Sequence, residues 1–152
     1  MIVDRVSLFA EQLDQLVAAA ERAFPEECCG LLFGNKPGSA WQILAIRPMR
    51  NASKRPRAGF EFDAGEQLRA YRDADAAGLE LLGHYHSHPN ARAGPSPTDL
   101  QLAQTRMDHD LWLILAVESG KCSDFSVWQL HEEPGVFERV ELCLLNKEIE
   151  GD

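Results

Sequence analysis

The sequence predicts a single α/β domain in which a mixed, curved β-sheet is flanked by helices. Segments with strand-like hydrophobicity alternate along the chain with segments whose apolar residues recur at helical spacing. The chain has 152 residues, enough for one domain with a substantial core. Its composition, 45% apolar and 26% charged, is ordinary for a globular protein. We therefore expect residues 1–152 to form one domain, with a C-terminal tail over about residues 143–152.

The N-terminal segments predict a strand, a helix and a hairpin. Val6 to Leu8 is expected to be a short edge strand. Apolar residues at helical spacing predict a helix from Ala10 to Phe24, which Pro25 ends. The apolar run from Cys29 to Phe33, closed by a glycine, suits a buried strand. Trp41 to Ile46 follows a Pro-Gly turn and could pair with that strand as a hairpin.

The middle of the chain predicts a second helix and a further strand. Phe60-Glu61-Phe62 alternates in polarity and leads to Asp63, a plausible N-cap. A helix from Ala64 to about Ala77 should follow and should stop at Gly78. Glu80 to His86 is then expected to be a strand.

The C-terminal third predicts one helix and three strands. The helix should run from Pro97 to about Met107. Leu111 to Val117 and Phe125 to Leu130 have the composition of central strands. Val136 to Leu145 could be a last strand, or a strand followed by a fraying tail.

Charge and hydropathy exclude two classes of partner. The net charge is −9, from 24 acidic and 15 basic side chains, which argues against binding nucleic acid through its phosphate backbone. No segment approaches the ~20 apolar residues that span a membrane. The N-terminus lacks the basic and then apolar pattern of a signal peptide. We therefore expect a cytoplasmic protein that binds neither nucleic acid nor membrane. The sequence does not indicate its oligomeric state.

One segment departs from the acidic balance. Five cations lie between residues 47 and 57, namely Arg47, Arg50, Lys54, Arg55 and Arg57. Most of them fall in a long polar loop that we expect from Pro48 to Gly59. The segment is either a solvated loop or a basic lip that attracts an acidic partner surface or a C-terminal carboxylate.

The four cysteines do not form a C-x-x-C pair, which argues against a zinc deaminase, whose signature ends in P-C-x-x-C. Cys28 and Cys29 are adjacent, so on a strand they point to opposite faces and are poorly placed to share a metal. We expect all four, with Cys122 and Cys143, to be small buried apolar residues.

The segment from Gly83 to Leu100, GHYHSHPNARAGPSPTDL, carries the chemistry. His86 and His88 are two residues apart, so on a strand their imidazoles share one face and can reach one ion. Asp99 can return across the Pro- and Gly-rich loop as a third ligand. Three protein ligands leave a fourth tetrahedral position for water, which is typical of a catalytic zinc site.

Two neighbouring features have structural interpretations as well. His84 extends the pattern to H-x-H-x-H, so three histidines share one face of the strand. Apolar β-branched residues would normally occupy such a face, which disfavours a chance cluster of histidines. Ser96-Pro-Thr-Asp99 predicts a helix start, with Ser96 at the N-cap, Pro97 at N1 and Asp99 at N3, close to a capping box. A helix start holds a hydroxyl and a carboxylate rigidly, so capping and metal ligation can coexist.

These residues resemble the motif of the JAMM (MPN-plus) metallopeptidases, which is a distant glutamate, then H-S/T-H-P, a loop and S-x-x-D. The chain has HSHP at residues 86–89, a loop from Pro89 to Pro95, and then SPTD at residues 96–99. Bacterial members place the glutamate in a segment like P-x-E-x-C-G-L-L-x-G, and PEECCGLLFG at residues 25–34 fits it. The resemblance covers roughly residues 6–130.

The resemblance implies an MPN fold, which is cytidine-deaminase-like, and one zinc ion per chain held by His86, His88 and Asp99. Glu27 would take a proton from the attacking water, and Ser96 would donate its hydroxyl to the oxyanion. His84 is extra to the motif and would lie behind the ligands or at the surface.

The choice of glutamate leaves one competitor. Glu26 is next to Glu27, and it would face the other way if the strand has already begun. We therefore expect Glu27 to be the catalytic residue. Both long loops, Pro48 to Gly59 and Pro89 to Pro95, should flank the metal.

The resemblance further implies hydrolysis of an amide bond at the glycine-ended C-terminus of a ubiquitin-like or sulfur-carrier protein, by trimming or by deconjugation. Three alternatives stay open. The chain could be a non-catalytic MPN interaction scaffold, although such scaffolds lack the ligands. It could be a relative of a JAMM-like domain in DNA-repair proteins, although its acidic balance weighs against DNA. It could also be a peptidase for small peptide-like substrates.

Overall fold

The computed structural model describes residues 2–103, 111–131 and 136–146. Seven strands and three helices lie within these residues. The strands are β1 (Arg5–Phe9), β2 (Cys29–Asn35), β3 (Ala40–Met49), β4 (Glu80–Pro89), β5 (Leu111–Glu118), β6 (Lys121–Leu130) and β7 (Phe137–Leu145). The helices are α1 (Ala10–Ala23), α2 (Ala64–Ala76) and α3 (Pro97–Ala103). The end of the third helix, which the sequence places near Met107, lies outside the described residues.

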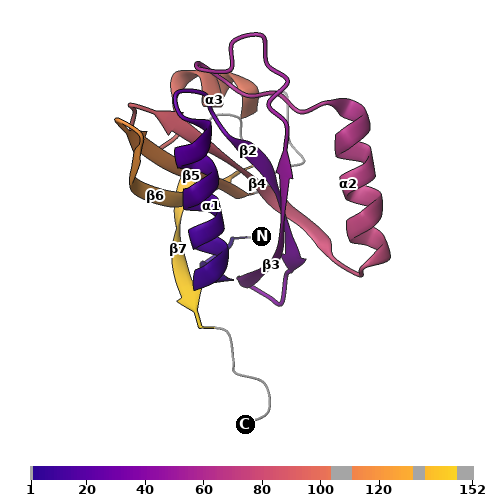
Figure 1. Cartoon of the computed structure of the whole chain (residues 1–152). Coiled ribbons are helices and arrows are strands. Elements are labelled where there is room, and N and C mark those ends of the chain that lie inside the picture. Colours follow the sequence, from indigo (N-terminus) through magenta and orange to yellow (C-terminus); the bar gives the residue numbers. More distant parts are fainter. Residues whose placement is uncertain (1, 104–110, 132–135, 147–152) are drawn as a thin grey trace.

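The strands form one mixed sheet that closes on itself in the order β1-β3-β2-β4-β5-β6-β7 (Figure 1). β1 is parallel to β3 and β7, and β4 is parallel to β5, while the other neighbours are antiparallel. The predicted α/β class with a mixed, curved sheet is confirmed, as is the hairpin of β2 and β3. The expected edge strand at Val6–Leu8 is wrong, because β1 pairs on both sides and so closes the sheet.

The two faces of the sheet pack against different helices. α1 and α2 lie on opposite sides of the view in Figure 1. Tyr85 of β4 belongs to the larger core, which also contains Leu13 and Leu16 of α1. Leu31 of β2 belongs to a second cluster with Ala70 of α2. Leu82 of β4 still belongs to the larger core, and beyond it side chains alternate along the strand, so His84, His86 and His88 lie on the face opposite Tyr85.

Gly83 permits the ladder that carries the histidines. Gly83 pairs with Leu111 at the start of the parallel β4–β5 ladder. A Cβ on Gly83 would collide with the backbone of Leu111. The absence of a side chain therefore lets β5 approach β4 closely enough to begin pairing there.

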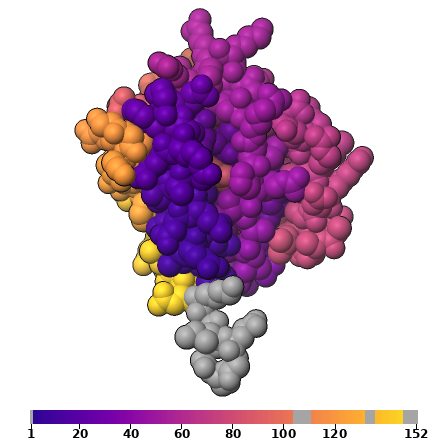
Figure 2. Space-filling view, viewed as in Figure 1, coloured from indigo at the N-terminus to yellow at the C-terminus, as the bar shows by residue number. Residues whose placement is uncertain are grey.

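The cationic segment divides between a strand and a loop. β3 continues to Met49, so Arg47 lies in a strand, where it pairs with Asp73 of α2 at 2.9 Å. Arg50 lies 3.9 Å from Glu66 of α2. We call residues 50–59 the rim loop. Figure 2 shows the chain that follows β3 projecting from one end of the molecule.

The cysteines and the C-terminal strand differ in part from expectation. All four cysteines are free thiols, but Cys29 alone is buried, while Cys28, Cys122 and Cys143 are half-buried. Cys28 packs against the α1 side and Cys29 belongs to the α2 side, as expected of adjacent strand residues.

β7 runs to Leu145 because its last residues pair with β1, so the start of the expected tail is part of the sheet. None of the described helices is long and apolar enough to cross a membrane.

Candidate metal centre

β4 and the start of α3 bring three potential metal ligands together. Nε2 of His86 lies 3.0 Å from Nε2 of His88. Asp99 Oδ2 lies 3.2 Å from the first of these nitrogens and 3.0 Å from the second. All three side chains are buried, and one ligand atom from each lies within 4.8 Å of the others. This is a compact set of two imidazoles and one carboxylate, a combination that divalent zinc accepts.

The second ring nitrogen, Nδ1, of each of these histidines also lies near a polar atom. Nδ1 of His88 lies 2.7 Å from the carbonyl oxygen of Arg92, so the hydrogen-bond network assigns the proton to Nδ1 and leaves Nε2 with a lone pair. Nδ1 of His86 lies 3.3 Å from Nε2 of His84. His84 is buried, so of the two positions expected for it, the one behind the ligands is correct and the surface position is wrong.

The start of α3 fixes Asp99. Ser96 Oγ accepts the backbone N–H of Asp99 at 3.0 Å, and Asp99 Oδ2 accepts the backbone N–H of Ser96 at 3.0 Å. This is the reciprocal bonding of a capping box, with Asp99 in the position that glutamate usually takes. The same carboxylate therefore caps the helix and faces the two histidines.

Glu27 is held beside this group by the rim loop. Its side chain is buried, whereas Glu26 is exposed. The backbone N–H of Glu27 donates to the carbonyl of Pro56 at 2.7 Å. Asn51 Nδ2 donates to the carbonyl of Glu27 at 3.0 Å and to that of Gly59 at 3.0 Å. Asn51 therefore ties both ends of the rim loop to the backbone of Glu27. No sequence motif marks this asparagine, which looks like any other polar loop residue.

The electrostatics of the group follow from its burial. Burial raises the pKa of Glu27 to about 7. Burial opposes ionisation of Asp99 too, but the two histidines outweigh it and hold the pKa of Asp99 well below its usual range. Burial lowers the pKa of His86. Burial lowers the pKa of His88 as well, but the hydrogen bond and charge of Asp99, together with the Arg92 carbonyl and the charge of Glu27, outweigh it, so the pKa of His88 is raised.

The loop between the ligands is anchored to β5 and β6 by hydrogen bonds. Ser126 Oγ donates to the carbonyl of Ala93, and Trp128 Nε1 donates to Ser126 Oγ at 2.7 Å. The backbone N–H of Asn90 donates to the carbonyl of Val117 at 2.6 Å. No pattern in the sequence indicates these anchors, because serine and tryptophan are common in strands without such a role.

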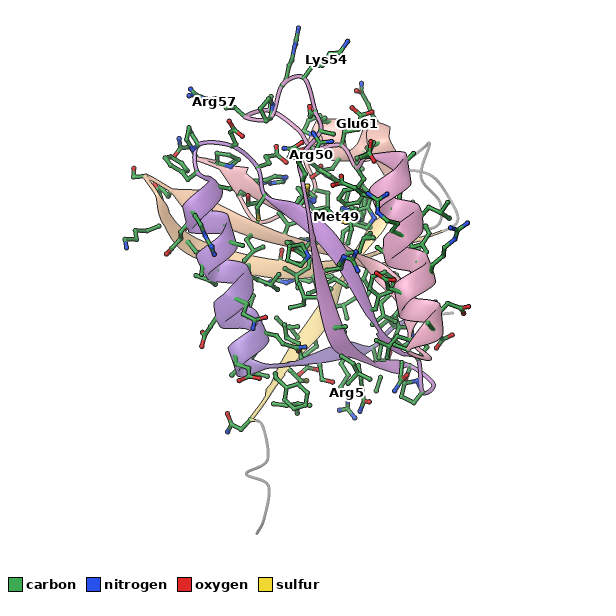
Figure 3. All side chains as sticks on the ribbon, turned by 45° about the vertical axis from the view of Figure 1, so that its right-hand side comes forward. Arg5, Met49, Arg50, Lys54, Arg57 and Glu61 are labelled. Carbon is green, nitrogen blue, oxygen red and sulfur yellow. The ribbon has the colours of Figure 1, made fainter. Side chains whose placement is uncertain are left out.

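A pocket of about 730 Å³ opens beside the ligands. It is lined by Glu27, Ser96 and Asp99, and also by Lys54 and Arg55 of the rim loop. Figure 3 shows the rim loop at one end of the molecule, with the Lys54 and Arg57 side chains pointing away from its body. Of the two loops expected to flank the metal, the rim loop lines this pocket, and the loop from Pro89 to Pro95 contacts His88 through the carbonyl of Arg92.

Comparison with known proteins gives a family match over most of the chain. Residues 9–131 match the family model described as prokaryotic homologs of the JAB domain. A desampylase of Haloferax volcanii is 33% identical over 107 residues, which are 68% of this chain and 76% of the relative. A CysO-cysteine peptidase of Mycobacterium tuberculosis is 37% identical over 94 residues, which are 62% of each chain.

A solved structure has a similar fold. The solution structure of protein DSY2949 from Desulfitobacterium hafniense superposes with a TM-score of 0.79 at 30% identity. The superposition covers 93% of this chain and 94% of DSY2949.

Proposed function

The chain belongs to the family of prokaryotic homologs of the JAB domain, and on that premise we propose that it is a zinc-dependent peptidase of the JAMM type. Its substrate is the glycine-ended C-terminus of a ubiquitin-like or sulfur-carrier protein, at which it hydrolyses an amide bond. The buried group of His86, His88 and Asp99 carries the proposal, because it adjoins a pocket that Glu27 and Ser96 also line.

The donor set suits zinc. Two imidazole nitrogens and a carboxylate oxygen are common zinc ligands, and three protein ligands leave room for water. When bound, zinc would supply Lewis acidity to a water molecule and to the scissile carbonyl. The protein's part is to hold its donors in place, which β4 does for the histidines and the capping box does for Asp99.

Glu27 supplies the proton acceptor. In the metal-free protein burial raises the pKa of the Glu27 carboxyl to about 7, which makes its carboxylate a stronger base than a solvated one. Glu27 takes the proton of the attacking water and then delivers it to the leaving amine. The hydrogen bonds from Asn51 and to Pro56 hold its backbone at the edge of the pocket.

Ser96 supplies the hydrogen-bond donor. Its Oγ uses a lone pair to accept the backbone N–H of Asp99. That bond leaves the hydroxyl proton available for the carbonyl oxygen of the substrate as negative charge develops there. Such a donor is worth about 10²–10³ in turnover.

The charges of the rim loop support the proposal that the substrate is a protein. Lys54, Arg55 and Arg57 are exposed, and none of them forms a salt bridge within the described part of the chain. They provide a cationic edge to the pocket for an acidic surface of the carrier. A glycine-ended tail can pass such an edge closely, since glycine has no side chain. The names of the two relatives, a desampylase and a CysO-cysteine peptidase, agree with such a substrate.

The test uses a carrier protein extended by extra residues after its C-terminal Gly-Gly. Mass spectrometry should show cleavage directly after the second glycine, and removal of metal by a chelator should abolish it. A carrier with a Gly-to-Val change in its tail should be cleaved far more slowly. An isopeptide-linked conjugate, assayed beside the fusion, separates trimming from deconjugation.

The controls make the proposal falsifiable. Equal cleavage of the glycine and valine tails would show that the pocket is not built for glycine. Rapid digestion of casein would indicate a general peptidase. Purified protein that takes up no zinc would overturn the metal assignment.

A further inference from the structure

His84 is a buried polar residue that the proposed reaction does not use. It lies on β4 two residues before His86, and only 1% of its surface is exposed. Its Nε2 lies 3.3 Å from Nδ1 of His86. The two rings are nearly parallel, with an interplanar angle of 15° and centroids 5.3 Å apart.

Packing does not explain a histidine at this position. The ring of His84 contacts three aromatic side chains, with centroid distances of 4.4 Å to Trp112, 5.1 Å to Phe60 and 6.4 Å to Phe62. An apolar side chain would fill this space without desolvating a polar group. A buried imidazole, by contrast, is costly unless it is hydrogen-bonded. The approach of Nε2 to Nδ1 of His86 is a polar contact that an apolar residue here would lack.

The two ligand histidines have the same requirement. To bind a metal through Nε2, each must carry its proton on Nδ1 and direct it to an acceptor. His88 has the carbonyl of Arg92, at 2.7 Å from its Nδ1. For His86, the imidazole of His84 occupies the corresponding position beside Nδ1. The acceptor for His86 is thus a side chain, which can be changed without disturbing the backbone.

We propose that His84 is a positioning residue for the metal centre. Its Nε2 accepts the Nδ1–H of His86, which fixes Nε2 of His86 as the nitrogen that faces Asp99 and the metal. The ring of Phe60 stacks on the imidazole of His86, with centroids 4.6 Å apart, and so holds it in that orientation. This inference rests on the proposed zinc site but not on the identity of the substrate.

The test measures zinc affinity by competition with a chromophoric chelator. His84→Phe keeps an aromatic ring among Phe60 and Trp112 but removes the acceptor, and we expect zinc to bind about 10–100-fold more weakly. His84→Gln restores an acceptor near the position of Nε2, so its zinc affinity should lie within about threefold of the parent. The metal-free His84→Phe protein should melt at or above the temperature of the metal-free parent, because an apolar ring replaces a polar one.

A second measurement does not depend on any variant. Nitrogen-15 spectra of the histidine rings in the zinc-loaded parent should show a proton on Nδ1 of His86 and none on Nε2 of His84. A proton on Nε2 of His84 would overturn the inference, as would a folded His84→Phe protein that binds zinc as tightly as the parent. Either result would leave the proposed peptidase intact if the parent binds zinc, whereas a parent without zinc affinity would overturn both.

Discussion

At the scale of single residues, Glu26 and Glu27 form a natural matched pair. They are adjacent carboxylates, but only Glu27 is buried in the pocket beside Asp99. We expect Glu27→Gln to keep its zinc content and to lose hydrolysis, because glutamine preserves the shape of the side chain but cannot accept the proton. Glu26→Gln should retain the parent rate. Metal analysis and turnover on the carrier fusion check both variants, and the reverse pattern would assign catalysis to Glu26.

The pKa of Glu27 also predicts how stability depends on pH in the metal-free protein. Burial raises this pKa from 4.5 to about 7, so the folded state binds more protons than the unfolded state between these values. The contribution of Glu27 to folding stability is therefore fully present below pH 4.5 and is lost as pH rises through about 7. Glu27→Gln has no such titration. Its free energy of unfolding should exceed that of the parent increasingly across this range, by up to about 3 kcal/mol above pH 7.

Urea unfolding of both proteins from pH 4 to pH 8, with a chelator present, measures that difference. Glu26→Gln is the control, since it removes a neighbouring carboxyl that lies outside the pocket. Parallel curves for Glu27→Gln and the parent would show that the Glu27 carboxyl titrates normally. The comparison tests the electrostatics of the pocket without any substrate.

Residues differ in how far the sequence predicts them. His86, His88 and Asp99 were predictable because strand periodicity and helix capping fix their directions from local rules. Asn51 and Ser126 were not, since their partners, Glu27 and Ala93, lie 24 and 33 residues away along the chain. A hydrogen bond across such a separation leaves no periodic trace in the sequence.

At the scale of elements, the start of α3 combines two functions in one residue. Ser96→Ala removes the N-cap hydroxyl that accepts the backbone N–H of Asp99, which should cost about 0.5–2 kcal/mol of stability. It also removes the proposed donor to the oxyanion, so turnover should fall by about 10²–10³, less than in Glu27→Gln. Thermal melting and kinetics must be measured together. Ser96→Thr keeps a hydroxyl and should restore most of both losses.

If Ser96→Ala melts lower but turns over at the parent rate, the serine is a helix cap and nothing more. The described part of α3 is short, from Pro97 to Ala103, so its start depends strongly on the capping box.

The predicted elements show where local rules stop. The strand around Val6 was recognised, yet its place between β3 and β7 was not, because pairing on both sides depends on closure of the whole sheet. β2 likewise continues past Gly34 to Asn35, with a register shift at Phe33 and Gly34 that local composition does not reveal. Element type follows from local periodicity, whereas strand order follows from contacts between distant segments.

At the scale of the whole molecule, charge is distributed unevenly. The net charge is −9, but the rim loop carries exposed Lys54, Arg55 and Arg57, of which the first two line the pocket. The net negative charge repels an acidic partner, whereas the cations of the rim loop attract it. The electrostatic field therefore favours an approach in which the partner faces the pocket. Arg5 lies exposed at the opposite end of the molecule (Figure 3).

This distribution predicts the effect of reversing charge. The double variant Arg55→Glu and Arg57→Glu should raise KM for the carrier about tenfold at low salt and change kcat little, because these contacts lie away from the bond that breaks. The increase should shrink above ~0.3 M salt, where exposed charges are screened. Arg5→Glu, which changes the net charge without touching the rim loop, should leave KM near the parent value. Arg5→Glu changes the net charge half as much as the double variant does, so a rise in KM of about threefold from Arg5→Glu would mean that net charge alone matters. A fall in kcat at unchanged KM would place the two arginines in the chemical step, and the carrier would then have to be recognised elsewhere on the surface.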